Sequence, residues 1–250
     1  MPIHYLRSLT ARNRTVLANR RLGLALAFVA GAANAGGFLA VGQYTSHMSG
    51  IVSALADNLA IGETMLVVGG LSALAAFLCG AAASAMLINW GRRRQAHSEY
   101  AMPLLLEALL LLCFGLLGSN LEHHRVMFMP ATVGLLCFVM GLQNAMITKI
   151  SKAEIRTTHV TGLVTDIGIE LGKLFYWNLG EAQGGEKVRA DRARLRLLSS
   201  LLGMFLAGAL AGAFGFKYAG FVATIPLATI LVALAVVPVL DDLRGRSARA

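Results

Sequence analysis

Long apolar runs alternate with short polar connections along this chain of 250 residues. The runs approach the roughly twenty apolar residues that a helix needs to cross a bilayer. We predict six membrane-spanning helices, at residues 22–42, 65–89, 101–119, 127–148, 197–216 and 219–239. Two further segments, 43–64 and 155–176, mix apolar residues with hydroxyl, His and Gly residues. Their pattern predicts short or broken half-helices.

The composition agrees with a membrane protein. Hydrophobic residues make up 56% of the chain and charged residues only 14%, which is too little polar material to cover a soluble globule. The basic amino-terminal stretch runs into a Gly- and Ala-lined span with no polar cleavage region, so we expect no cleavable signal peptide. The predicted fold class is an all-α membrane protein.

The positive charge indicates which side of the membrane the connections face. Nineteen of the 22 Lys and Arg residues fall in five connections, at residues 7–21, 92–94, 149–156, 187–196 and 244–249. The net charge of +9 therefore follows the loops between apolar runs, which is not the pattern of a nucleic-acid-binding face, and we expect no nucleic-acid partner. The positive-inside rule places all five connections in the cytoplasm.

This charge distribution selects one of two topologies. If 43–64 and 155–176 crossed the membrane fully, the basic residues 92–94 and 149–156 would lie outside. If both segments are re-entrant, six crossings remain and both termini are cytoplasmic. We therefore predict the organisation 1–21 (cytoplasmic basic segment), 22–119 (first membrane repeat), 127–240 (second membrane repeat) and 241–250 (cytoplasmic tail).

A repeated motif supports this division. Residues 45–55 read TSHMSGIVSAL and residues 157–167 read TTHVTGLVTDI, while GAANA at 31–35 recurs as GLQNA at 141–145. Interrupted apolar segments at matching places in two halves indicate an inverted-topology repeat with a transport site near the midplane. The alternative is an old duplication retained for close helix packing by small residues.

The repeated block also supplies suitable chemistry for a site. Its hydroxyl groups can cap a helix start, its glycines let backbone approach closely, and the start of a half-helix attracts anions. We predict that a small polar or anionic solute binds at this block. The predicted binding residues are Asn34, Thr45, Ser46, His47, Ser49, Gly50, Asn144, Thr157, Thr158, His159, Thr161 and Gly162. The two histidines have an alternative role as helix caps.

Acidic residues differ between the two copies. We predict Asp57, Asp166 and Glu170 as groups that bind a coupling proton or cation, because carboxylates at membrane depth usually face a cavity or a cation. For Glu170, a structural pair with Lys173 is the alternative, and for Asp166 the alternative is a cap or a pair within the short helix. We expect Glu107 to form a hydrogen bond between helices, and a second coupling acid is the alternative.

Other kinds of site lack a sequence signature. No HExxH, CxxC or GxSxG motif is present, and all three cysteines lie in apolar spans, so we expect no metal and no cofactor. A membrane-embedded enzyme and a structural or sensory membrane protein remain alternatives to transport. The expected partners are the lipid bilayer and a small molecule or ion. The Gly- and Ala-rich run at 201–215 also allows a homo-oligomer.

Two blocks resemble a known family. GAANAGGFLAVGQYTSHMSG at 31–50 and GLQNAMITKISKAEIRTTHVTGLVTDIGIELGK at 141–173 are similar to the YoaK-like family, and the likeness covers about residues 20–240. The resemblance implies a multi-pass protein of the bacterial inner membrane. Small-molecule transport is sometimes assigned to this family, but the resemblance brings no established substrate, cofactor or catalytic residue.

Overall fold

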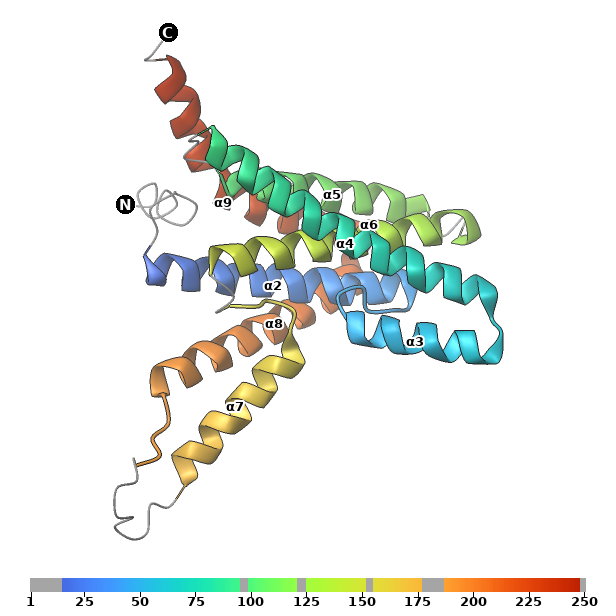
Figure 1. The fold of residues 1–250 in the computed structure, drawn as a ribbon. Helices are drawn as coiled ribbons and strands as arrows, with labels where there is room; N and C mark the ends of the chain where they lie inside the picture. Colours follow the sequence, from blue (N-terminus) through green and yellow to red (C-terminus); the bar gives the residue numbers. More distant parts are fainter. Residues whose placement is uncertain (1–14, 95–98, 121–124, 152–154, 177–186, 248–250) are drawn as a thin grey trace.

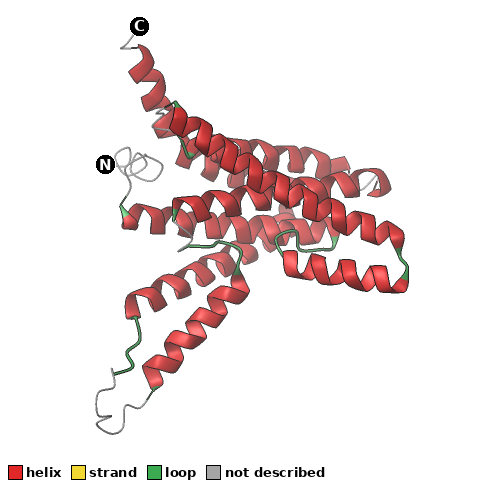
Figure 2. Cartoon of the chain, viewed as in Figure 1, coloured by secondary structure: helices red, strands yellow, loops and turns green. Residues whose placement is uncertain are grey.

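The computed structural model describes residues 15–94, 99–120, 125–151, 155–176 and 187–247 (Figure 1). Over these ranges the chain is helical between its loops and contains no strand (Figure 2). The elements are α2 (Val16–Val41), α3 (Met48–Ile61), α4 (Thr64–Arg93), α5 (Ala101–Asn120), α6 (Arg125–Ile150), α7 (Val160–Phe175), α8 (Arg192–Ala219), η1 (Gly220–Ala223) and α9 (Thr224–Ser247). The all-α prediction is confirmed for this part of the chain.

Five stretches are long and apolar enough to cross a membrane. Four of them belong to α2, α4, α5 and α6, and the fifth runs from Arg192 to Val236 through α8, η1 and α9. The sequence places the start of the last helix at residue 219, but α9 begins at Thr224. This boundary was wrong because Gly220 has a φ of 59°, which ends α8 and opens a 3₁₀ turn.

Glycines bring the long helices together in two pairs, α2 with α8 and α4 with α6. A Cβ atom at each of four glycines would overlap the carbonyl oxygen of a phenylalanine in the facing helix. These contacts are Gly31 with Phe205, Gly208 with Phe28, Gly80 with Phe138, and Gly141 with Phe77. Each helix pair thus contains two reciprocal points where backbone meets backbone, the close approach that small residues allow in membrane helices.

The helices α2 and α6 lie next to one another near the centre of the bundle (Figure 1). The buried side chain of Gln143 in α6 donates a hydrogen bond of 3.1 Å from Nε2 to the carbonyl oxygen of Leu26 in α2. On another side, α5 packs against α9. The centre of the bundle is therefore fixed by the first helix of each half.

The two short helices begin near the middle of the bundle and run in opposite directions. The chain turns back after α2, and α3 then runs beside α4 toward the right-hand end in Figure 1. The chain also turns back after α6, and α7 runs beside α8 toward the left-hand end. The two loops that precede α3 and α7 consequently face one central region.

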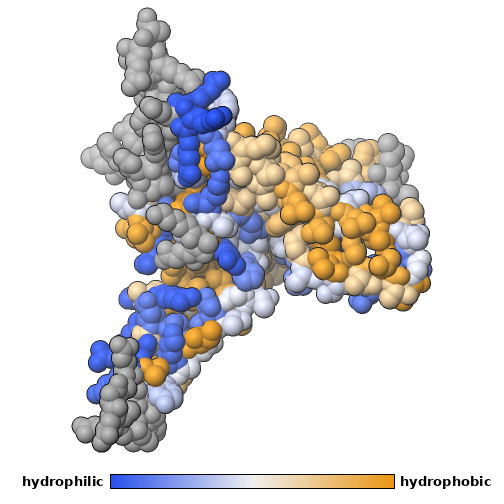
Figure 3. Space-filling model, in the orientation of Figure 1, coloured by the Kyte–Doolittle hydropathy of each residue, from blue (hydrophilic) through white to orange (hydrophobic). Residues whose placement is uncertain are grey.

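Hydrophobic and hydrophilic residues occupy different ends of the molecular surface. Figure 3 shows hydrophobic residues over the right-hand part of the molecule and hydrophilic residues along the left-hand end, where α2 begins and α4 ends. Large apolar side chains stand exposed on α4, such as Met65 at 82% and Leu78 at 60% exposure. Apolar surface of this extent is typical of contact with lipid. Together with the five apolar stretches, it indicates a multi-pass membrane protein.

Candidate functional site

Matching hydrogen bonds tie the loops before α3 and α7 to the long helices. The hydroxyl of Ser46 donates to Oδ1 of Asn34 at 2.9 Å, and the hydroxyl of Thr158 donates to Oδ1 of Asn144 at 2.8 Å. The backbone N–H of Ser46 also lies 3.4 Å from the same Asn34 oxygen. Both asparagines and both hydroxyl residues are half-buried. The equivalent residues of the two copies thus perform the same structural task.

These bonds correct the predicted role of the hydroxyl groups. Neither α3 nor α7 has a side-chain cap, and the N-cap residues are His47 and His159. The Ser46 and Thr158 hydroxyls do not cap the first turn because they are directed to the asparagines. The first N–H groups of a helix have no partner within the helix, so both short helices keep uncapped amino-terminal ends.

The paired glycines also have a different role from the one expected. A Cβ atom at Gly50 would overlap the imidazole of His47, and a Cβ atom at Gly162 would overlap the imidazole of His159. Each histidine ring therefore lies against the first turn of its own helix. The space left by the absent side chain is filled by this ring, so it is not free for a solute.

Thr45 and Thr157 point away from the loops' open side. Their exposure is 1% and 0%, and their hydroxyl oxygens have no hydrogen-bond partner among the described residues. The Thr45 hydroxyl lies close to Gly37 of α2, on the packed side of the turn. The residue that follows each threonine, Ser46 or Thr158, faces the open side instead.

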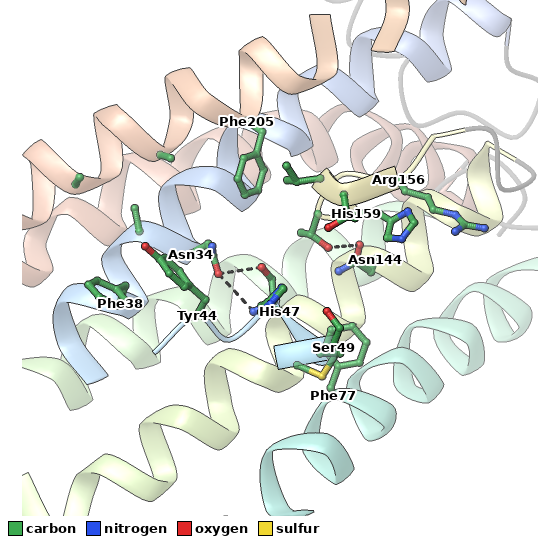
Figure 4. Close-up of a pocket in the computed structure, with 18 of the residues that line it drawn as sticks. Asn34, Phe38, Tyr44, His47, Ser49, Phe77, Asn144, Arg156, His159 and Phe205 are labelled. Atoms are coloured by element: carbon green, nitrogen blue, oxygen red, sulfur yellow. Dashed lines mark hydrogen bonds between the residues drawn. The ribbon is translucent and has the colours of Figure 1, made fainter. Parts of the chain in front are cut away.

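A cavity of about 1160 Å³ lies where the two loops meet. Eight of the twelve predicted binding residues line it: Asn34, Ser46, His47, Ser49, Asn144, Thr158, His159 and Thr161. Four do not, namely Thr45, Gly50, Thr157 and Gly162. Figure 4 shows the two hydrogen-bonded asparagines and the two histidines around this cavity. The structure therefore brings together polar residues that are more than a hundred positions apart in sequence.

Aromatic residues form much of the remaining wall. Phe38 and Tyr44 stack with their ring centroids 4.6 Å apart and 19° between their planes. Phe77 of α4 and Phe205 of α8 line other sides of the cavity (Figure 4). Sequence reasoning did not select these residues, because aromatic side chains in apolar helices are usually packed in a core or against lipid.

Arg156 also lines the cavity and was missed by sequence reasoning. It was assigned to a basic cytoplasmic connection, yet it lines the cavity beside His159 (Figure 4). Its side chain is exposed, and no described residue forms an ion pair or hydrogen bond with it. The signal that could have identified it is its position, three residues before the repeated histidine, where the first copy has Tyr44.

A second cavity of about 440 Å³ shares Arg156 and His159 with the first. It lies among α2, α7 and α8, and its lining includes Asp166, Asp191 and Arg194. Asp191 caps α8 by accepting hydrogen bonds of 3.0 Å from the N–H of Arg194 and 2.9 Å from that of Ala193. These hydrogen bonds, that from Arg194 above all, lower the pKa of the Asp191 carboxyl.

The three predicted coupling acids lie in different surroundings. Asp166 forms an ion pair with Arg194 of α8, at 3.0 Å, and lines the second cavity. Glu170 is buried, pairs with Lys173 at 2.9 Å and accepts a hydrogen bond of 2.8 Å from the Asp191 N–H, as in the structural alternative. Asp57 is exposed, has no partner among the described residues and lines neither cavity.

Glu107 departs from expectation. Its side chain in α5 is fully buried, and neither carboxylate oxygen has a hydrogen-bond partner among the described residues. The predicted hydrogen bond between helices is therefore wrong for this part of the chain. The neighbouring faces of α6 and α9 are mainly apolar, so the helix pairing at Glu107 does not bring a donor within reach.

The described residues offer no obvious metal site. No group of three or more His, Cys, Asp or Glu side chains lies close enough within the described ranges to hold an ion. The cavity chemistry there consists of amide, hydroxyl, imidazole and guanidinium groups. These groups are suited to binding a polar or negatively charged molecule.

Comparison with known proteins places the chain among membrane proteins without an assigned activity. Residues 22–237 match the model of a family described as protein of unknown function (DUF1275). The chain is also 29% identical over 157 residues to the UPF0700 transmembrane protein YoaK of Bacillus subtilis (strain 168), covering 60% of this chain and 67% of that protein. No solved structure matches the chain. The resemblance to a YoaK-like family is thereby confirmed.

Proposed function

The chain belongs to the DUF1275 family of proteins of unknown function, and we propose that it is a secondary transporter or channel for a small polar or anionic solute. The observation that carries the proposal is the cavity of about 1160 Å³ between the two repeated loops. Cavities of this size, with a few convergent polar groups in apolar walls, are typical binding sites. In a membrane protein, irregular backbone at bilayer depth is tolerated where it lines such a cavity.

An inverted-topology repeat of residues 22–119 and 127–240 is part of the proposal. Its support lies in the reciprocal glycine contacts, where Gly31 against Phe205 corresponds to Gly141 against Phe77. The pair Gly208 and Phe28 corresponds in the same way to Gly80 and Phe138. The opposite directions of α3 and α7 are those expected of halves inserted with opposite orientation (Figure 1).

The proposed topology has six crossings and two re-entrant half-helices. α3 has 14 residues and α7 has 16, so they are about 21 Å and 24 Å long and too short for a hydrocarbon core of roughly 30 Å. The starts of α2 and α8 and the ends of α4 and α6, which carry basic residues, lie toward the same end of the bundle (Figure 1). We assign this end to the cytoplasm of a bacterial inner membrane. Basic residues 7–14, Lys152 and Arg249 lie outside the described residues.

Coupling to a proton or cation is proposed for Asp166. It is the predicted coupling acid that lines a cavity, and that cavity shares Arg156 and His159 with the central one. Its ion pair with Arg194 joins α7 to α8. Protonation of Asp166 would neutralise one partner of this pair, and so would change the contact between two helices that line the second cavity.

Reconstitution tests the transport proposal. The purified protein would be placed in liposomes, and uptake of labelled acetate, benzoate, phosphate, methylamine and glycerol would be compared with protein-free liposomes. We expect at least one probe to enter faster with protein present, and we expect the double variant Asn34→Leu and Asn144→Leu to lose this uptake. If the double variant took up the probe as fast as the wild-type protein, the solute would not pass through the central cavity. Uptake that never exceeds the protein-free level would contradict transport of these classes of solute.

A further inference from the structure

The central cavity differs between its two ends. Tyr44 and Arg156 each stand three residues before the histidine that precedes a short helix, so they occupy equivalent places in the two loops. Both line the cavity, and Figure 4 shows Arg156 with His159 on one side and Tyr44 with Phe38 on the other. The repeated residues place similar polar groups in both loops. The difference between Tyr44 and Arg156 gives the cavity an aromatic end and a cationic end.

Among the residues that the structure describes, no acidic side chain lines the cationic end of the central cavity. No Asp or Glu occurs among the described residues that line the central cavity, and Arg156 has no ion-pair partner among them. Guanidinium offers a rigid set of N–H donors that matches a carboxylate or similar oxyanion. Asn144 and His159 lie at the same end (Figure 4), and Thr158, which is hydrogen-bonded to Asn144, lines the cavity with them. This end of the cavity is therefore suited to one anionic group.

The aromatic end of the cavity is suited to an apolar part of the ligand. Phe38 and Tyr44 are 41% and 50% exposed, and their stacked rings form an apolar face on the cavity. Phe77 and Phe205 extend the apolar wall. A volume of about 1160 Å³ is far larger than an inorganic anion needs, and lies just above the roughly 300–1,000 Å³ of pockets that hold drug-sized molecules.

The second cavity points to the same sign of charge. Its lining contains Arg20, Arg156 and Arg194 against Asp166 and Asp191, which leaves an excess of positive charge. This excess is a single positive charge, and a net positive lining favours the approach of anions. The second cavity therefore favours an anion near Arg156 and His159, which line both cavities.

We propose that the central cavity binds an organic monoanion that has an apolar or aromatic body, with Arg156 holding the anionic group and the Phe38–Tyr44 face holding the body. This inference rests on the proposed solute site and names the class of its ligand. Asn34 and Asn144 position the two loops, since their side-chain oxygens are occupied by Ser46 and Thr158. Arg156 has no such partner among the described residues, and its donors can bind the ligand.

Binding to the full-length protein in detergent tests this assignment. Labelled benzoate would be the reference probe, and competition by acetate, benzamide and benzylamine would separate the requirement for charge from that for an apolar body. We expect saturable benzoate binding, competition by acetate and benzamide only at concentrations at least about tenfold higher, and no competition by benzylamine. Loss of charged hydrogen bonds typically weakens binding by about ten- to a hundredfold, and this loss is expected for Arg156→Gln.

Matched variants control for indirect effects. Arg156→Lys keeps the charge and should lose less affinity than Arg156→Gln, while Arg93→Gln removes an exposed arginine that lines neither cavity and should bind benzoate normally. Phe38→Ala should weaken benzoate binding and leave acetate competition unchanged. The inference is overturned if wild-type protein shows no saturable benzoate binding, if benzylamine or benzamide competes as well as unlabelled benzoate, or if Arg156→Gln binds like wild type.

The outcome also separates this inference from the transport proposal. If benzoate binds in an Arg156-dependent way but does not enter liposomes, the anion site is supported and transport of benzoate is contradicted. Uptake of methylamine or glycerol that is unchanged in Arg156→Gln, together with no saturable benzoate binding, would support transport and contradict the anion assignment.

Discussion

Asp166 of α7 and Arg194 of α8 form an ion pair with Oδ2 and Nη2 3.0 Å apart, on the wall of the second cavity. In the sequence repeat Asp166 stands opposite Ala54, so the first copy lacks the acid. The Asp166 and Arg194 side chains are 39% and 53% exposed, and exposed pairs contribute only about 0–1 kcal/mol to stability. A role in coupling would therefore be separable from a role in folding.

Asp166→Asn mimics the protonated acid at nearly constant volume. If Asp166 binds the coupling ion, this variant should retain exchange of solute between the two sides and lose uphill accumulation. Counterflow and gradient-driven uptake in the same proteoliposomes measure both quantities. Arg194→Gln keeps the acid but removes the pair that protonation would break, and should likewise lose uphill accumulation. Accumulation by Asp166→Asn at the wild-type level would remove this residue from the mechanism.

Thr158→Val removes the hydroxyl that donates to Asn144 at almost unchanged volume. Loss of such a hydrogen bond typically costs about 1 kcal/mol, and here it frees the loop that places Arg156 and His159 at the cavity. We expect weaker solute binding, by up to about tenfold, in the benzoate assay. Thr165→Val is the matched control, because its hydroxyl bonds only to the Thr161 carbonyl in the same helix. Similar benzoate binding by both variants would show that the Thr158–Asn144 hydrogen bond does not contribute to the binding site.

Gly141→Ala tests the contact between α6 and α4. The added Cβ would overlap the carbonyl oxygen of Phe77, and overpacking of this kind costs about 1–3 kcal/mol. The midpoint of denaturant-induced unfolding should fall. Gly69→Ala in α4 is the control, since a Cβ there meets no atom within 4 Å and alanine favours helix by about 1 kcal/mol. Equal midpoints for Gly141→Ala and wild type would show that the helices separate at little cost.

The proposed topology predicts the side on which two positions react. In a variant without Cys79, Cys113 and Cys137, a cysteine at Glu63, between α3 and α4, should react with an impermeant maleimide added to intact cells. A cysteine at Arg93, at the end of α4, should react only after the membrane is permeabilised. Labelling of the Arg93 position in intact cells would contradict the re-entrant arrangement.

The repeated polar residues could be located from the sequence, whereas their individual roles could not. Ser46 and Thr158 were expected to cap the short helices, but each donates to an asparagine of a preceding long helix. Thr45 and Thr157, one position earlier, are buried and do not reach the cavity. A shift of one residue in a turn changes the direction of a side chain completely, and that direction depends on where the turn packs.

The apolar runs by themselves determined that this is an all-α membrane protein, since spanning a bilayer depends on local length and hydrophobicity. The repeat likewise identified the two loops in which the cavity residues lie. The tertiary structure decided that Arg156 lines the cavity, that Phe77 and Phe205 form its walls, and that Asp166 pairs with Arg194. These relationships join residues on different helices, so they depend on how the helices pack against one another, which no local stretch of sequence specifies.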